Sequence, residues 1–343
     1  MKKIIVSVTV AAMALMSAGC AKMAESGAND ANKRYFDAWM KVNYPDAQAS
    51  GLGIYVIEDT PGTGPEVKKD GFALIDYVIT DLEGNISSYT DKTTAEQMGS
   101  FDESYFYGAK LQTTADGTLP AGYSQGLVGM KVGGSRKFII PGWLMSYSTY
   151  DTEEQYLENE SSSSSAIYNI TVKDYTDDII GWQKVQIEKY FNDNSDIFEN
   201  MTIRDTIPDH GGCWYKQTKA PTSDEKFSSD TTIYINYTGM LLNGLIFDTT
   251  DERTALDNGI WSASKTYEPV KITWGEAYTD ITMGSGSSVI GGFALTLWQM
   301  KANESGIGVF TSEYGYGYSG SGSSIPPYSP LVFKIEIVEE PED

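Results

Sequence analysis

The stretch GFALTLWQMK, residues 292–301, decides the fold because a related stretch, GYSQGLVGMK, occurs earlier in the chain at residues 122–131. In both stretches apolar residues recur at positions i, i+4 and i+7, which places one apolar stripe along a short helix. These residues are Phe293, Leu297 and Met300 in the later stretch, and Tyr123, Leu127 and Met130 in the earlier one. The sequence therefore predicts two copies of one structural unit around two short buried helices.

Other matches extend the duplication over most of the chain. GLGIY at residues 51–55 matches GGCWY at residues 211–215. The number of residues between these two stretches also separates Tyr77 from Tyr237. Each half ends in a segment that alternates apolar and polar residues, which is typical of a half-buried strand. We predict a tandem duplication with its boundary near Asp178.

The order of elements within each half predicts an α+β unit. Strand-like segments precede and follow the short helix, with turn residues between them, and this favours a mostly antiparallel sheet. In the second half, residues 231–240 alternate and Asn243-Gly244 supplies a tight turn before the chain returns. Residues 251–267 and the serine run 161–165, with the acidic stretch before it, are expected to be surface loops.

The N-terminal residues are typical of an exported protein. Two lysines precede an apolar run at residues 4–16, and small residues lead to Cys20, as in a secretory signal. The pattern resembles a bacterial lipoprotein signal, although Ser17 stands where leucine is usual. We expect a signal peptide at residues 1–19, a lipid on Cys20 that tethers the protein to a membrane, and a location in the cell envelope, in the periplasm or at the outer membrane.

Charge and residue counts argue against several classes of function. The net charge of -22 would repel the phosphates of nucleic acid. His210 is the single histidine, so histidine-based metal sites and Ser-His-Asp triads lose their support. Cys213 is the single cysteine besides Cys20, and no phosphate-binding GxxxxGK[ST] loop occurs. We therefore expect no nucleic acid, no metal and no cofactor.

The second half resembles the FKBP-type peptidyl-prolyl cis-trans isomerases over about residues 211–339. It carries the family's motifs in order: Tyr237-Thr238-Gly239, Asn243-Gly244, Phe247-Asp248, Val289-Ile290-Gly291-Gly292-Phe293, Tyr314-Gly315-Tyr316-Gly317, Ile325-Pro326-Pro327 and Leu331-Val332-Phe333. The resemblance implies two tandem FKBP-like domains, each a twisted antiparallel sheet wrapped around a short helix. It predicts a tether and N-terminal helix at residues 20–50, domains at 51–178 and 209–343, and a linker helix at 179–208.

The resemblance also implies roles for ten residues of the second half. A catalyst of prolyl isomerisation breaks no bond to hydrogen, so it needs a dry apolar pocket and a donor for the substrate carbonyl rather than a nucleophile. The implied catalytic residues are Tyr237, Phe247, Asp248, Ile290, whose backbone N–H would donate to that carbonyl, and Tyr316. The implied substrate-binding residues are Val289, Phe293, where many members have tryptophan, Ile325, Pro326 and Phe333. Core packing alone would also account for several of these apolar positions.

The first half departs from the motifs where the chemistry would take place. Ser87 and Ser88 stand at the positions of Phe247 and Asp248, and Leu119-Pro120 stands at Val289-Ile290. Proline has no backbone N–H and cannot donate to a carbonyl. We predict that the first half keeps the fold and lacks catalysis, although Tyr77, Tyr147 and Tyr168 still match wall positions.

Two functions remain open from the sequence. The first is a peptidyl-prolyl isomerase that assists the folding of exported proteins, also as a chaperone, with proline-containing polypeptides as its partners. The alternative is a non-catalytic peptide- or protein-binding lipoprotein, because a fold does not guarantee activity. Intact motif residues favour the isomerase. Residues 251–267 would favour the alternative if they covered the pocket.

Overall fold

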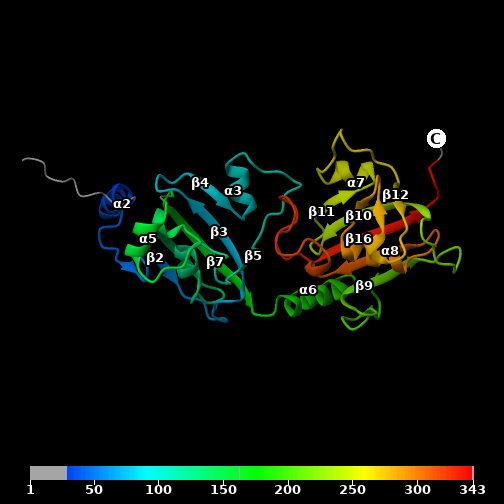
Figure 1. The fold of residues 1–343 in the computed structure, drawn as a ribbon, viewed down its shortest axis with the longest axis horizontal. Coiled ribbons are helices and arrows are strands. Elements are labelled where there is room, and N and C mark those ends of the chain that lie inside the picture. The colour runs from blue at the N-terminus through cyan, green and yellow to red at the C-terminus, as the bar shows by residue number, and fades with distance from the viewer. Residues whose placement is uncertain (1–28, 162, 342–343) are drawn as a thin grey trace, which may run out of the picture.

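Two antiparallel sheets divide the chain into two α+β domains (Figure 1). The computed structural model describes residues 29–161 and 163–341, so the predicted signal peptide and Cys20 lie outside the described residues. The first domain lies at the left of Figure 1 and the second at the right, and helix α6 (Ile179–Asp193) joins them. The predicted fold class, two tandem α+β units that each have an antiparallel sheet and a short helix, is confirmed.

The first domain holds a seven-stranded sheet with the order β1-β2-β6-β7-β3-β4, in which β5 also pairs with β3. Its elements are α2 (Asp30–Asn43), β1 (Ala49–Ser50), β2 (Ile54–Thr60), β3 (Phe72–Thr80), β4 (Ile86–Tyr89), α3 (Lys92–Gln97), β5 (Lys110–Thr113), α4 (Ala121–Leu127), β6 (Ser135–Ile140), η1 (Gly142–Leu144), α5 (Glu153–Asn159) and β7 (Ala166–Thr176).

The second domain holds a nine-stranded sheet with the order β14-β13-β12-β10-β16-β15-β9-β8, in which β11 also pairs with β10. Its elements are β8 (Thr206–Ile207), β9 (His210–Lys219), β10 (Thr232–Leu241), β11 (Ile246–Thr249), α7 (Glu252–Asp257), β12 (Val270–Thr273), η2 (Tyr278–Asp280), β13 (Thr282–Met283), β14 (Ser287–Ser288), α8 (Gly291–Gln299), β15 (Ser305–Phe310), η3 (Ser312–Tyr314) and β16 (Leu331–Val338).

Helix α8 lies in the core of the second domain, as its apolar stripe predicts. Phe293 and Leu297 are buried against the concave face of the sheet. A glycine is required at position 292 because a Cβ there would lie 2.2 Å from the ring of Phe310. Gly122 of α4 has the same role in the first domain, where a Cβ would lie 2.4 Å from Ile140. Both sheets therefore approach their helix closely.

Helices α2 and α6 each pack on one domain. Phe36 of α2 is buried in the core of the first domain, with its ring 5.5 Å from Trp143 in an edge-to-face arrangement. Ile187 and Phe191 of α6 pack against the outer face of the second sheet, where Val332 is buried as well. Strand β16 is thus buried on both faces at its start, which is why its alternation is broken at Val332.

The prediction that residues 251–267 form only a loop is wrong, because these residues contain helix α7. The Asp251 carboxylate accepts a hydrogen bond from the Thr254 N–H and caps the helix, and Asp91 caps α3 in the same way in the first domain. We call residues 91–108 the first arm and residues 251–267 the second arm. The duplication therefore includes both arms.

The two arms also end alike. The Ser262 N–H donates to the Tyr267 hydroxyl at 2.9 Å in the second arm, and the Asp102 N–H donates to the Tyr107 hydroxyl at 3.0 Å in the first. The acidic stretch before the serine run was also predicted as a loop, but it forms helix α5. A complete capping box of Thr152 and Gln155 stabilises the start of this helix.

Within the described ranges, none of the helices has the length and apolar character that crossing a membrane requires.

Candidate functional site

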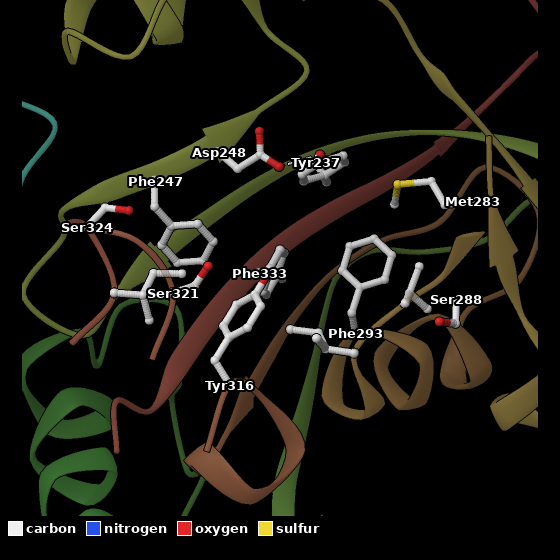
Figure 2. Close-up of a pocket in the computed structure, with 13 residues that line it drawn as sticks. Tyr237, Phe247, Asp248, Met283, Ser288, Phe293, Tyr316, Ser321, Ser324 and Phe333 are labelled. Atoms are coloured by element: carbon white, nitrogen blue, oxygen red, sulfur yellow. Dashed lines mark hydrogen bonds between the residues drawn. The ribbon is translucent and has the colours of Figure 1, made fainter. Parts of the chain in front are cut away.

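A cavity of about 440 Å³ opens between the sheet of the second domain and the N-terminus of α8 (Figure 2). Strands β10, β11 and β16 supply one wall, α8 supplies the floor, and the segment between η3 and β16 supplies a lip. The lining residues are Tyr237, Phe247, Asp248, Met283, Ser288, Val289, Ile290, Phe293, Tyr316, Ser321, Ser324, Ile325 and Phe333. The cavity thus brings together nine of the ten residues predicted for the site.

Aromatic rings in edge-to-face contact form the base of the cavity. Phe293 and Phe333 are 2% and 4% exposed, and their ring centroids lie 5.1 Å apart at an interplanar angle of 81°. Phe247 approaches Phe333 at 5.6 Å, and Tyr237 approaches Phe293 at the same distance. Such perpendicular contacts are favoured by the ring quadrupoles and hold the rings in place. The result is a rigid apolar surface that suits a small aliphatic ring.

Asp248 forms the polar edge of the cavity. The Tyr237 hydroxyl donates a hydrogen bond to Asp248 Oδ2 at 2.6 Å, and Lys265 of the second arm forms an ion pair with Oδ1. Burial, together with the neighbouring Asp248 carboxylate, raises the pKa of Tyr237 above its usual value. Tyr237 therefore stays protonated and donates. Lys265 was not among the predicted residues, since nothing in its local pattern links it to Asp248.

Ile290 presents a backbone donor to the cavity. It is the N-cap residue of α8, with φ -64° and ψ 148°, and its carbonyl accepts from the Ala294 N–H. Within the described part of the chain, no hydrogen bond uses the Ile290 N–H. Free N–H groups at a helix start attract an acceptor, and here the acceptor can be a substrate carbonyl. Pro120 occupies the same position before α4, with φ -54° and ψ 143°.

The lip is a tight hairpin that places Ile325 in the cavity. Ser321 and Ile325 exchange two backbone hydrogen bonds, at 2.8 and 3.1 Å. Gly320 adopts a φ of 62°, and a Cβ there would lie 2.2 Å from the Ile325 carbonyl oxygen, so only glycine fits. Pro326 follows Ile325 but is not among the lining residues, which differs from its predicted contact with substrate. Its carbonyl accepts a hydrogen bond from the Ser329 hydroxyl.

Four lining residues were not predicted from the sequence motifs. Met283 and Ser288 come from the short strands β13 and β14, which precede α8, and Ser321 and Ser324 come from the lip. Strands of two residues have no detectable alternation. The only available signal for them was their closeness in sequence to Val289 and Ile325.

Small residues beside Phe333 keep the cavity open. Phe333 pairs with Gly239 on one side and with Gly308 on the other. A Cβ on Gly239 would lie 2.6 Å from the ring of Phe247 and 2.8 Å from that of Phe333. The cavity therefore depends on glycine at position 239.

In the first domain larger side chains take both glycine positions. Tyr168, which stands at the place of Phe333, pairs with Ile79 and Phe138. Phe138 stacks on Tyr168 at 5.5 Å, and Tyr123 lies against the same ring at 4.9 Å. Rings and a branched side chain thus occupy the region that is hollow in the second domain.

No His, Cys, Asp and Glu cluster that could hold a metal ion occurs in residues 29–161 and 163–341. Cys213 is buried, and burial raises the pKa of its thiol, which disfavours the nucleophilic thiolate. The lining residues of the cavity themselves offer apolar contacts and hydrogen bonds.

Comparison with known proteins agrees with this geometry. The family profile described as FKBP-type peptidyl-prolyl cis-trans isomerase matches residues 76–173 and 223–338, one range in each domain. Together the two ranges cover more than half of the chain. The chain belongs to this family, and its two domains are a tandem pair of FKBP units.

Individual relatives are more distant. A probable FKBP-type peptidyl-prolyl cis-trans isomerase of Haemophilus influenzae is 30% identical over 136 residues, which cover 40% of this chain and 46% of that protein. The FKBP-type 22 kDa isomerase of Escherichia coli is 30% identical over 107 residues, covering 31% and 40%. The chain thus spans less than half the length of either relative.

Among solved structures, that of the three FKBP domains of wheat FKBP73 covers 83% of this chain and 93% of its own, with 14% identity. The TM-score of 0.29 is too low to bear on the fold or on how the domains are arranged.

Proposed function

We propose that this protein is a peptidyl-prolyl cis-trans isomerase whose active site is the cavity of the second domain. The observation that supports this most is the meeting of a rigid aromatic base with the unpartnered N–H of Ile290 in one cavity. Prolyl isomerisation has a barrier of about 18–20 kcal/mol, set by amide resonance, and it needs no acid, base or metal. A site of this composition matches that requirement.

Each part of the cavity has a task in this mechanism. The proline ring lies on Phe293 and Phe333, which exclude water from it. A twisted amide is less polar than a planar one, so an apolar surrounding favours it over the ground state. The Ile290 N–H binds the carbonyl of a neighbouring peptide unit and orients the chain. Tyr237 and Lys265 hold Asp248 at the edge, where its carboxylate can accept a hydrogen bond from the substrate backbone.

The first domain, in this proposal, keeps the fold without turnover. Pro120 removes the donor that Ile290 supplies, and Ile79 and Phe138 fill the space beside Tyr168. We place the two domains at residues 51–178 and 209–343, joined by the segment at 179–208, which begins with helix α6.

The proposal extends to the setting of the activity. The lysines, the apolar run at residues 4–16 and Cys20 support export and a lipid anchor in the cell envelope. The partners are then proline-containing segments of exported proteins, which the protein helps to fold.

The test is the cis-to-trans rate of a short Ala-Pro peptide in the presence of the full chain. The wild-type protein should accelerate isomerisation in proportion to its concentration. A variant with Phe247→Ala and Asp248→Ala should lose at least tenfold in kcat/KM, about 1.4 kcal/mol of transition-state stabilisation. A folded protein that binds the peptide without accelerating it would instead favour the non-catalytic binding protein.

A further inference from the structure

A second cavity lies where the two domains meet. It has a volume of about 330 Å³, and its walls include Tyr105 of the first arm, Trp261 of the second arm, and Ser323 of the lip. In Figure 1 the teal segment that follows α3 extends from the first domain to the orange lip of the second. This cavity is thus built from both domains.

Direct contacts fix the first arm against the second domain. The Phe106 N–H donates to the Ser323 carbonyl at 2.9 Å, and the Phe106 side chain packs against the core of the second domain. A second contact between the domains joins Phe72 to Tyr328, whose rings lie 5.0 Å apart, edge to face. The lip of the candidate active site is therefore supported by the domain that lacks the catalytic residues.

The second cavity continues the first one. Phe247 and Ser324 line both, so a chain that leaves the proline pocket past the lip enters the space between the arms directly. An extended chain advances about 3.3 Å per residue, which places residues roughly two to four positions from the proline in this space. The occupant suggested by this continuity is the substrate polypeptide itself.

Charge and aromatic surface define which side chain fits there. Tyr105 and Trp261 are 43% and 45% exposed, so both rings offer a face to a ligand. Two glutamates lie directly behind lining residues, although neither lines the cavity itself. Glu252 accepts a hydrogen bond from the Trp261 Nε1, and Glu103 lies against Gly259. Among the described residues neither glutamate is in an ion pair, whereas the nearby Lys265 is paired with Asp248. Aromatic faces with carboxylates nearby that no described cation pairs with favour a guanidinium or ammonium group.

We propose that the cavity between the arms is a subsite for a basic side chain, Arg or Lys, located two to four residues from the isomerised proline. The first domain takes part in substrate selection through Tyr105, although it does not catalyse. This inference rests on the proposed isomerase function of the second domain. The subsite would give the first domain, which lacks the catalytic residues, a role in binding substrate.

The experiment compares three kinds of peptide with the full chain. The first is an Ala-Pro tetrapeptide that reaches only the proline pocket. The second and third are long peptides with a central Ala-Pro, one carrying Arg and the other Glu at positions two to four from it. Each long peptide is made with these residues before the Ala-Pro and, separately, after it. The wild-type protein should turn over the Arg peptide about tenfold faster than the Glu peptide in kcat/KM at low ionic strength, on the side that enters the cavity. Tyr105→Ala should reduce this preference below threefold and leave the tetrapeptide rate unchanged.

The control variant is Tyr35→Ala. Tyr35 is another exposed tyrosine of the first domain, and it lines neither cavity. It should keep the preference for Arg. Equal rates for the Arg and Glu peptides on both sides, or an unchanged preference in Tyr105→Ala, would overturn the subsite.

The proposed function and the subsite fail in different ways. If the tetrapeptide is not isomerised, the proposed function is wrong, and the subsite is judged by the fluorescence anisotropy of labelled Arg and Glu peptides. Tighter binding of the Arg peptide that is lost in Tyr105→Ala would support the subsite even then, and equal binding would refute it.

Discussion

Gly239 determines whether the second domain has a cavity. The residue has no positive φ, so alanine is compatible with the backbone there, but its Cβ would meet the rings of Phe247 and Phe333. We predict that Gly239→Ala displaces these rings, lowers kcat/KM for a proline peptide at least tenfold, and costs about 1–3 kcal/mol of stability through overpacking.

Peptide kinetics and urea unfolding check this prediction. Gly211→Ala is the matched control, because a Cβ on Gly211 has nothing within 4 Å. Full activity in Gly239→Ala would show that the rings beside position 239 do not define the site.

At the scale of single residues, the sequence predicted the apolar lining better than the polar edge. The order of the motifs that resemble the family predicts Tyr237, Ile290 and Phe333 in one pocket, and all three line the cavity. Lys265 could not be found this way, because its ion pair with Asp248 depends on how the second arm turns back over β11. The catalytic roles of these residues stay predictions until rates are measured.

Besides its apolar contacts, helix α6 is tied to the second domain by the hydrogen bonds of one buried polar side chain. Gln183 donates to the Ser312 hydroxyl and accepts from the Ser312 N–H, each at 2.8 Å, and it is fully buried. We predict that Gln183→Ala lowers the free energy of unfolding by about 1–3 kcal/mol, because it leaves the buried Ser312 N–H without its partner. Urea denaturation measures the change.

Gln186→Ala is the control, since Gln186 lies on the same helix and is only partly buried. If both variants lost the same stability, helix propensity rather than the bond to Ser312 would explain the effect.

Among the elements, those with a regular period were predicted and the short ones were not. Helix α8 follows from apolar residues at i, i+4 and i+7, and β16 from its alternation. Helices α3 and α7 have six residues each, too few to show a period, so residues 251–267 were predicted as a loop and α3 was not predicted. Their capping aspartates, Asp91 and Asp251, were the available signal.

Buried tyrosines make the stability of the whole molecule sensitive to alkaline pH. Burial raises the pKa of Tyr168 to about 12, and it also raises those of Tyr123, Tyr215 and Tyr237. Unfolded tyrosine has a pKa of about 10, so above that pH the unfolded chain loses protons that the folded one keeps. Stability is therefore complete below pH 10 and falls as the pH rises through 12.

Urea midpoints measured between pH 8 and pH 12 test this prediction. Tyr168→Phe removes one of the titrating groups, so its midpoint should decline less steeply above pH 10. An identical decline in wild type and variant would mean that Tyr168 ionises as easily folded as unfolded.

At the level of the whole molecule, the duplication could be predicted and the docking of the domains could not. Matching motifs at equal separation predicted two related units. The contact of Phe106 with the lip joins the surfaces of two separate units. The apolar period of a helix or strand predicts packing within its own unit, so it does not predict this contact.

The central claim, an isomerase site at the start of α8, is tested most directly by comparing Ile290→Pro with Ile290→Ala in the full chain. The φ of Ile290 suits proline, so both variants should fold, but only proline deletes the N–H. We predict that Ile290→Ala still accelerates isomerisation of an Ala-Pro peptide and that Ile290→Pro is about tenfold slower than Ile290→Ala, as expected for one lost hydrogen bond. Equal rates for the two variants, or no acceleration by the wild-type protein, would contradict the account.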